Sequence, residues 1–167
     1  AVESSEDMPA SASSGAKPMA PPKGGQVVAL AEGAPEVDST SFVLVDFQSG
    51  EELAALNPGE RVEPASITKL MTAYILYREL SKGTIKLDDE VLISQRAWEM
   101  QGSRMFVELG KKIQLEKLLR GLIIQSGNDA AVALAEHVAG SESAFVQRMN
   151  ETAKELGMNN SQYQNVT

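Results

Sequence analysis

The most informative stretch of this 167-residue chain is Pro64-Ala65-Ser66-Ile67-Thr68-Lys69-Leu70-Met71-Thr72. Pro64 has a restricted φ and biases Glu63 toward an extended conformation, so the sequence predicts a helix that begins at about Ala65. Ser66 then lies in the first turn, where backbone N–H groups have no partner within the helix. Lys69 follows one turn later, which places both side chains on one face with Cβ atoms about 5–6 Å apart.

This Ser-x-x-Lys spacing has two interpretations. A serine hydroxyl becomes a good nucleophile when a nearby base takes its proton, and a lysine is such a base only when it is neutral. Neutrality requires desolvation or a second cation close by. The alternative is a helix-capping Ser66 followed by an exposed Lys69. With 16 serines and nine lysines in the chain, about one such pair arises by chance, so the pair alone does not separate these interpretations.

A second polar cluster is Gln125-Ser126-Gly127-Asn128-Asp129, between two predicted helices. Gly127 permits a tight backbone there. Ser126 could relay a proton and Asn128 could orient a substrate amide. The competing interpretation is that Asn128 or Asp129 caps the following helix.

Periodicity predicts the other elements. Residues 42–47 and 51–56 are expected to form a hairpin around the turn 48–50, and an apolar stripe should cover the helix that ends near Lys82. Residues 95–110 fit no single pattern. The stripe consists of Ile67, Leu70, Met71, Tyr74, Ile75 and Tyr77. The remaining expected elements are a strand at 90–93 and helices at 114–124, 128–139 and 142–156.

Several other residues are candidates for chemistry. His137 is interpreted as an uninvolved surface or boundary histidine, and residues 88–90 as a solvated turn. Trp98 and the stretch 102–106 could line a cleft, although core packing is the expected role of the aromatic side chains.

Composition excludes several classes of function. The chain has no cysteine and one histidine, which excludes a disulfide framework, a Cys nucleophile and a multi-His metal site. Its 15 basic and 23 acidic residues give a net charge of -8, which argues against nucleic acid as a partner. No run reaches the roughly 18 to 20 apolar residues of a membrane helix.

Composition also predicts two regions. Residues 1–36 are rich in Pro, Ser, Ala and Gly and are expected to be a disordered leader. Five of the seven prolines lie before residue 40. Residues 37–167 have the composition and hydrophobic patterning of a globular domain.

Taken together, the hairpin, the Ser66–Lys69 motif and the Ser126-Gly127-Asn128 motif 60 residues later resemble the D-alanyl-D-alanine carboxypeptidases, the low-molecular-mass penicillin-binding proteins. The resemblance implies an α+β fold with a helical cluster against an antiparallel sheet, incomplete in this chain. It implies Ser66 as the acylated nucleophile, Lys69 as its base, Ser126 as a proton relay and Asn128 as a substrate-binding residue. The expected reaction removes the terminal D-alanine from a peptidoglycan stem peptide, and β-lactams acylate the same serine.

The sequence departs from this family in one respect: it has no Lys-Thr-Gly motif after the Ser126 cluster. We therefore expect the parent protein to be active and these 167 residues alone to be inactive. The resemblance implies no metal and no organic cofactor. It places the protein in the periplasm or on the outer face of the cytoplasmic membrane, with membrane association only through a C-terminal segment that is absent here.

Three alternatives stay open. A serine β-lactamase of the same fold would carry a Glu-x-x-Leu-Asn segment about 35 residues after the second motif, and residues 162–166 read Gln-Tyr-Gln-Asn-Val instead. A non-catalytic relative would bind cell-wall peptide without turnover. A helical domain with coincidental motifs would need both clusters to arise by chance in this order.

Overall fold

The structure is a computed structural model that describes residues 38–167. The predicted leader, residues 1–36, lies outside the described residues. The described part of the chain divides into two units, one that ends at Gly59 and one that spans Glu60–Thr167. Both contain antiparallel strand pairs, and the second also contains the helices.

The first unit is the predicted hairpin. Strand β1 (Phe42–Val45) pairs antiparallel with β2 (Glu52–Leu56), with a bulge after Leu44. The Asp46 carboxylate closes the turn, because it accepts hydrogen bonds from the Ser49 amide and the Ser49 hydroxyl, each at 2.7 Å. These hydrogen bonds hold the pKa of Asp46 below its ordinary value. Gly50 has a φ of +72°, which glycine adopts without steric cost.

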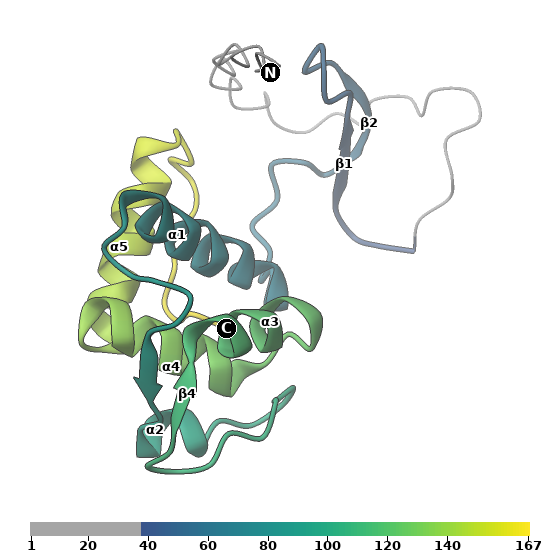
Figure 1. Ribbon diagram of the computed structural model, residues 1–167. Coiled ribbons are helices and arrows are strands. Elements are labelled where there is room, and N and C mark those ends of the chain that lie inside the picture. The colour runs from purple at the N-terminus through teal and green to yellow at the C-terminus, as the bar shows by residue number, and fades with distance from the viewer. Residues whose placement is uncertain (1–37) are drawn as a thin grey trace, which may run out of the picture. The chain divides into compact units, whose positions relative to one another are not determined.

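The second unit is built around helix α4. This helix contacts α1, α2, α3, α5 and strand β3, and every residue from Asp129 to Ala135 is buried. Figure 1 shows α4 among the other helices of this unit. The long helices are α1 (Thr68–Lys82), α3 (Leu115–Ile124), α4 (Asn128–Ala139) and α5 (Glu142–Glu155). Their positions agree with the predicted helices, and the start of α4 agrees to the residue.

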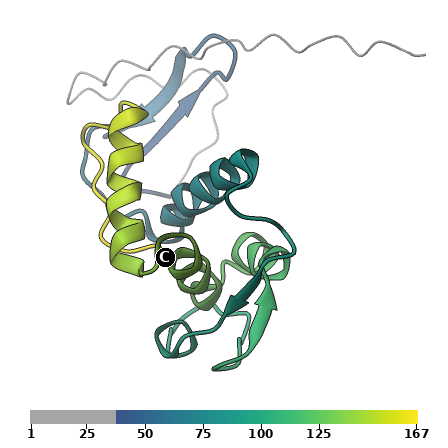
Figure 2. The same cartoon turned by 60° about the vertical axis from the view of Figure 1, so that its left-hand side comes forward.

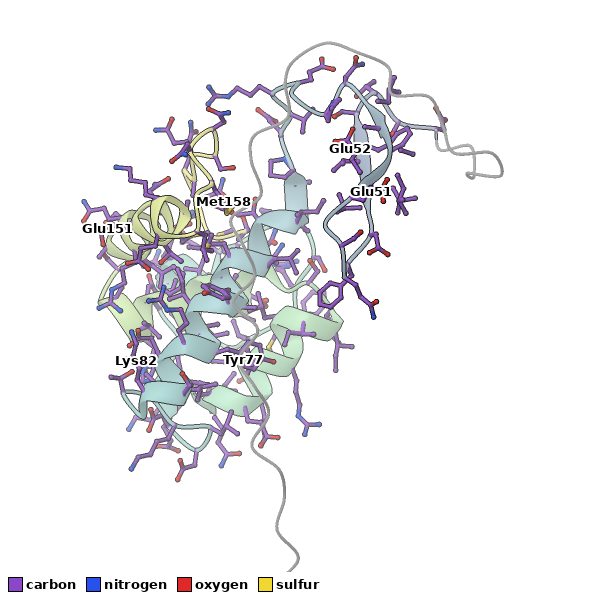
Figure 3. The ribbon with its side chains drawn as sticks, turned by 90° about the horizontal axis from the view of Figure 1, so that it is seen from above. Glu51, Glu52, Tyr77, Lys82, Glu151 and Met158 are labelled. Atoms are coloured by element: carbon purple, nitrogen blue, oxygen red, sulfur yellow. The ribbon has the colours of Figure 1, made fainter. Side chains whose placement is uncertain are left out.

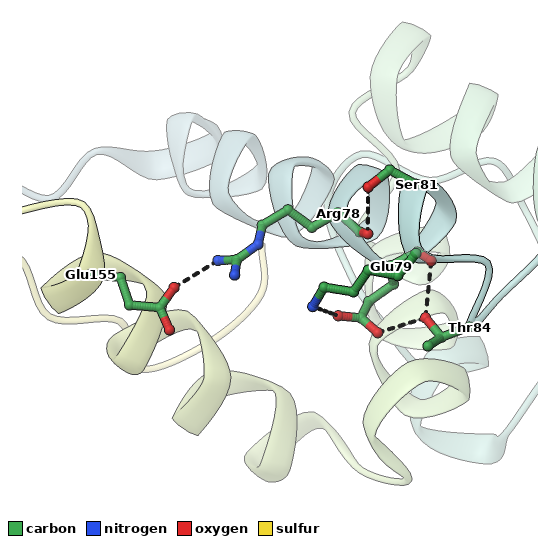
Figure 4. Close-up of polar contacts among 6 residues, drawn as sticks. Arg78, Glu79, Ser81, Thr84 and Glu155 are labelled. Atoms are coloured by element: carbon green, nitrogen blue, oxygen red, sulfur yellow. Dashed lines mark hydrogen bonds and ion pairs between the residues drawn. The ribbon is translucent and has the colours of Figure 1, made fainter. Parts of the chain in front are cut away.

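The two ends of α1 are built differently. A 3-10 turn, Ala65–Ile67, precedes it, so the α-helix begins at Thr68 rather than at the predicted Ala65. At its far end Gly83 adopts a φ of +73°, and the Thr84 hydroxyl donates to the Glu79 carbonyl at 2.9 Å (Figure 4). The ion pair of Arg78 with Glu155, at 2.8 Å, joins α1 to α5.

The buried face of α1 differs from the predicted stripe. Met71 and Ile75 are buried as expected, but the structure corrects the assignment of the other four, since Ile67, Leu70, Tyr74 and Tyr77 are exposed. Figure 3 labels Tyr77 and Lys82 in the second half of this helix. The buried face turns toward Thr68, Lys69, Thr72 and Leu76 instead. Hydrophobic periodicity missed it because half of this face is polar.

Polar contacts explain how a mixed face is buried. The Thr72 hydroxyl donates to the carbonyl of Val166 at 2.9 Å, and both residues are fully buried. The same C-terminal segment is tied to α5, where Asn150 exchanges hydrogen bonds with the backbone of Tyr163 at 2.8 and 2.9 Å. The C-terminal segment therefore connects α5 to α1, where Val166 contacts the buried Thr72.

A second strand pair lies beside α2 and α4. Strand β3 (Glu90–Leu92) pairs antiparallel with β4 (Lys112–Gln114), as Figure 2 shows. The first of these strands was predicted, while β4 and the short helix α2 (Gln95–Trp98) were not. The expectation that aromatic residues here belong to the core is wrong, because Trp98 and Phe106 are exposed.

Candidate functional site

The structure brings Ser66 and Lys69 into direct contact. The Lys69 Nζ atom lies 2.9 Å from the Ser66 Oγ atom, in hydrogen-bonding distance. The Lys69 residue is only 6% exposed, whereas Ser66 is exposed to solvent. Burial lowers the pKa of Lys69, because an ammonium loses hydration inside the protein. An accessible hydroxyl thus contacts an amine that burial makes easier to deprotonate than a lysine in water.

This arrangement rules out the capping interpretation of the pair. Ser66 lies within the 3-10 turn and its side chain makes no capping hydrogen bond, and Lys69 is buried rather than exposed. Ala65, directly before the serine, has a φ of +47°. A non-glycine residue in this region costs about 1–2 kcal/mol, and such strain often accompanies functional sites.

The second cluster occupies the loop between α3 and α4. Ser126 is half-buried and has a φ of +54°, again in the left-handed region. Asn128 is the first residue of α4, and its Nδ2 atom donates to the Gln101 carbonyl at 2.6 Å. Within residues 38–167, neither the Ser126 hydroxyl nor the Asn128 Oδ1 atom makes a hydrogen bond. Both residues are partly exposed.

Neither Asn128 nor Asp129 occupies the N-cap position that the alternative interpretation gave them, although the Asp129 Oδ1 atom does accept from the first-turn Ala130 amide at 2.8 Å. The N-cap position belongs to Gly127, which has no side chain to cap with. Asp129 is instead 1% exposed and accepts a hydrogen bond from the Met105 amide at 3.0 Å and from the Val107 amide at 3.2 Å. This role was not predictable from the local sequence, since the two partners are more than 20 residues away.

The two clusters belong to the same unit of the protein. Helix α1 carries Lys69 and packs against α3 and α4, the helices on either side of the Ser126 loop (Figure 1). Among the described residues no hydrogen bond joins Ser66 or Lys69 to Ser126 or Asn128. The predicted site residues thus form two separately held pairs.

Other predicted features lie away from these pairs. His137 is at the boundary, with its Nε2 atom 3.6 Å from an Asp89 carboxylate oxygen. Residues 38–167 contain no group of three or more His, Cys, Asp or Glu side chains that could hold a metal ion. None of the helices described in this range is long and apolar enough to cross a membrane.

Comparisons with known proteins identify the family. The family model for D-alanyl-D-alanine carboxypeptidase (Peptidase_S11) matches residues 28–167. D-alanyl-D-alanine carboxypeptidase DacF of Bacillus subtilis is 44% identical over 130 residues, which cover 78% of this chain and 33% of the relative. DacC of Escherichia coli is 43% identical over 139 residues, which cover 80% of this chain and 35% of the relative. The chain spans about a third of the length of these relatives.

Solved structures agree with the sequence comparisons. The D-alanyl-D-alanine carboxypeptidase DacD from Francisella tularensis matches with a TM-score of 0.76 at 36% identity, over 87% of this chain and 35% of that one. Penicillin binding protein 5 from Haemophilus influenzae matches with a TM-score of 0.75 at 40% identity, over 79% of this chain and 39% of that one. The α+β fold predicted from the motifs, that of the DD-peptidases and penicillin-binding proteins, is confirmed. The chain belongs to the D-alanyl-D-alanine carboxypeptidase family.

Proposed function

We propose that the protein carrying this chain is a serine-type D-alanyl-D-alanine carboxypeptidase with Ser66 as its nucleophile. The observation that supports this most strongly is the 2.9 Å contact between the exposed Ser66 hydroxyl and the buried Lys69 amine. Burial lowers the pKa of Lys69, which favours the neutral amine that a general base requires.

The first half of the reaction transfers the peptide to the serine. The neutral Lys69 amine accepts the Ser66 proton while the Oγ atom attacks the carbonyl carbon of the penultimate D-alanine. The tetrahedral intermediate collapses when its C–N bond breaks, and the departing amine of the terminal D-alanine takes up a proton. An ester of Ser66 and free D-alanine result.

The second half regenerates the enzyme. A water molecule gives a proton to a base and attacks the ester carbonyl, after which the C–O bond breaks and Ser66 recovers its proton. The products are the shortened peptide and the free hydroxyl. A β-lactam would enter the first half in the same way, with opening of its ring amide in place of release of D-alanine.

The Ser126 loop is assigned two supporting roles. Ser126 relays a proton toward the leaving amine, and Asn128 holds an amide of the peptide. These roles are supported by the Ser126 hydroxyl and the Asn128 Oδ1 atom, neither of which makes a hydrogen bond within residues 38–167. The Asn128 Nδ2 atom has a second N–H besides the one donated to Gln101, so the amide can both donate to and accept from a peptide group.

We further propose a peptidoglycan stem peptide as the substrate and the periplasm or outer membrane face as the site of action. No metal or cofactor takes part. Because the 167 residues contain no Lys-Thr-Gly motif after Ser126, we expect the chain alone to be inactive. Loss of one transition-state donor already costs about 10²–10³ in rate.

The test is covalent labelling with a fluorescent penicillin, followed by peptide mapping. For the full-length gene product we expect stoichiometric labelling of Ser66 and release of D-alanine from a peptide ending in D-alanyl-D-alanine. The isolated 167 residues should label at least about 100-fold more slowly. Labelling at another residue, or none in the full-length product, would contradict the proposal. Rapid nitrocefin turnover would favour a β-lactamase. Peptide binding without turnover would favour a binding module.

A further inference from the structure

We infer that Asp129 is a positioning residue, whose carboxylate holds residues 101–107 against the start of α4 and thereby aims the Asn128 amide at the substrate. The inference rests on the proposed function, because it concerns the same reaction. Asp129 itself is 1% exposed and makes no contact with solvent that would let it act on a peptide directly.

The burial of this carboxylate is compensated by backbone donors. Its Oδ1 atom accepts from the Met105 amide at 3.0 Å and the Ala130 amide at 2.8 Å, and its Oδ2 atom from the Val107 amide at 3.2 Å. Among the described residues no Lys, Arg or His forms an ion pair with it. The first turn of α4 adds the favourable dipole of a helix N-terminus. The buried charge is therefore held by hydrogen bonds to amides, two of which come from the distant 101–107 segment.

Those two amides flank a strained residue. Phe106 lies between Met105 and Val107, has a φ of +60°, and is exposed, with the Arg104 guanidinium 4.9 Å from its ring centroid. A bulky side chain keeps such a backbone only when surrounding contacts enforce it. A single carboxylate that accepts from both neighbouring amides supplies that enforcement.

The held segment in turn orients Asn128. The Asn128 side chain donates to the Gln101 carbonyl at 2.6 Å, and the Asn128 backbone amide donates to the Ser103 carbonyl at 2.7 Å. If the segment moved, the Gln101 carbonyl would move with it and the Asn128 amide would lose its orientation. The Ser103 hydroxyl also donates to the Gln125 carbonyl, which ties the same segment to the residue before Ser126.

The two segments fit without free space. A Cβ atom added at Gly102 would lie 2.9 Å from the Asn128 Nδ2 atom, and one added at Gly127 would lie 2.9 Å from the Asp129 Oδ1 atom. Both glycines therefore leave room for the side chains that join the segments. Such close packing means that a small shift at Asp129 reaches Asn128.

The experiment replaces Asp129 with Asn in the full-length gene product. The amide has nearly the same size, but one acceptor oxygen becomes an NH₂ group, so one backbone hydrogen bond is lost. The matched control is Glu116→Gln, which removes a half-buried carboxylate from the first turn of α3 that pairs with Arg120. Two quantities are measured with fluorescent penicillin: the fraction of Ser66 that can be titrated, and the acylation rate constant of each titratable site. The kcat and KM for a D-alanyl-D-alanine peptide are measured alongside.

For Asp129→Asn we expect a titratable fraction close to that of the wild type and an acylation rate constant about 10- to 100-fold lower, because misplacement by about 1 Å has this effect. The peptide kcat/KM should fall in parallel, and Glu116→Gln should stay within about twofold of the wild type. A lower titratable fraction with an unchanged rate per site would mean that Asp129 only stabilises the fold, and would overturn the inference.

If Asp129→Asn does not fold, the same measurement is made on Asp129→Asn combined with Phe106→Gly. Glycine tolerates a positive φ, so the double variant needs less enforcement by the carboxylate. The double variant is compared with Phe106→Gly alone, which keeps the carboxylate: a lower rate per site in the double variant supports the inference, and equal rates in the two variants overturn it. A wild type that fails to acylate overturns the proposed function, whereas a wild type that acylates at the same rate as the variant overturns this inference alone.

Discussion

The Ser66–Lys69 pair and the Ser126–Asp129 loop are held in different ways. The pair is three residues apart on consecutive turns, and its 2.9 Å contact follows from local helical geometry. The loop is held by hydrogen bonds to residues 22 to 27 positions away in the chain. A substitution in the pair should therefore remove chemistry without moving the backbone, whereas a substitution around the loop should change geometry first.

Removal of the nucleophile is the most severe test of the pair. Ser66→Ala should abolish penicillin labelling and lower kcat by at least about 10⁴-fold, with little change in melting temperature because the Ser66 hydroxyl is exposed. Labelling kinetics and thermal melts measure both effects. Ser81→Ala, which alters an exposed serine near the end of α1, is the control and should retain full labelling. Persistent labelling of Ser66→Ala would show that a different residue is acylated.

Removal of the base tests whether burial sets the state of Lys69. Lys69→Met should lower the acylation rate constant by about 10²–10⁴-fold, the usual contribution of a general base. The melting temperature at neutral pH should be unchanged or higher, because the folded variant no longer bears the cost of removing a lysine side chain from water. A variant that acylates at the wild-type rate would exclude Lys69 as the base.

The difference in melting temperature between Lys69→Met and the wild type should depend on pH. The pKa of Lys69 is lower in the folded protein than in the unfolded chain, where lysine titrates near about 10.4. Between these two values the unfolded chain binds more protons, so this group makes the wild type more stable as pH rises. The advantage of Lys69→Met in melting temperature should therefore shrink as pH approaches about 10. A constant difference across that range would show that Lys69 titrates normally.

Two glycine substitutions test how the Ser126–Asp129 loop holds Asn128. The expected loss of activity is smaller than for the Ser66 and Lys69 variants. Gly102 and Gly110 both have a positive φ, +83° and +74°, but only at Gly102 would a Cβ atom meet the Asn128 Nδ2 atom. Gly102→Ala should lower kcat/KM about 10-fold or more, while Gly110→Ala should change kcat/KM less than twofold. Both variants should lose a similar amount of folding stability, because both place a side chain at a positive φ. Equal activities of the two variants would mean that the Asn128 amide need not be held in this position.

His137 provides the smallest expected effect, since it lies in neither region. His137→Gln removes only the 3.6 Å pairing with Asp89. Pairs of this kind contribute about 0–1 kcal/mol, so we expect a small shift in melting temperature and labelling within about twofold of the wild type. A large loss of labelling would show that the boundary of the site is wider than the two clusters.

Much of the fold was predictable from short-range patterns. The hairpin turn and the α4 start at Asn128 follow from turn residues and periodicity. The buried face of α1 was predicted incorrectly, because Thr72 is buried by a hydrogen bond to Val166, 94 residues away. Strand β4 was missed for a similar reason: its three residues are a strand only because β3 pairs with them.

The candidate site shows the same division. Ser66, Lys69, Ser126 and Asn128 were all proposed from their motifs, and the contact within the first pair is present. The role of Asp129 was missed, because a carboxylate at the start of a helix normally indicates capping. Its partners Met105 and Val107 lie in a stretch without periodicity, so no local signal connects them to α4.

Spacing along the chain was enough to place a hydroxyl and an amine on neighbouring turns, since helix geometry depends on steric contacts between residues close in sequence. Packing of distant segments was needed to bury Lys69 and lower its pKa, and to join Asp129 to the 101–107 segment. Desolvation and backbone pairing depend on which parts of the folded chain meet, and a motif contains no information about its neighbours in space.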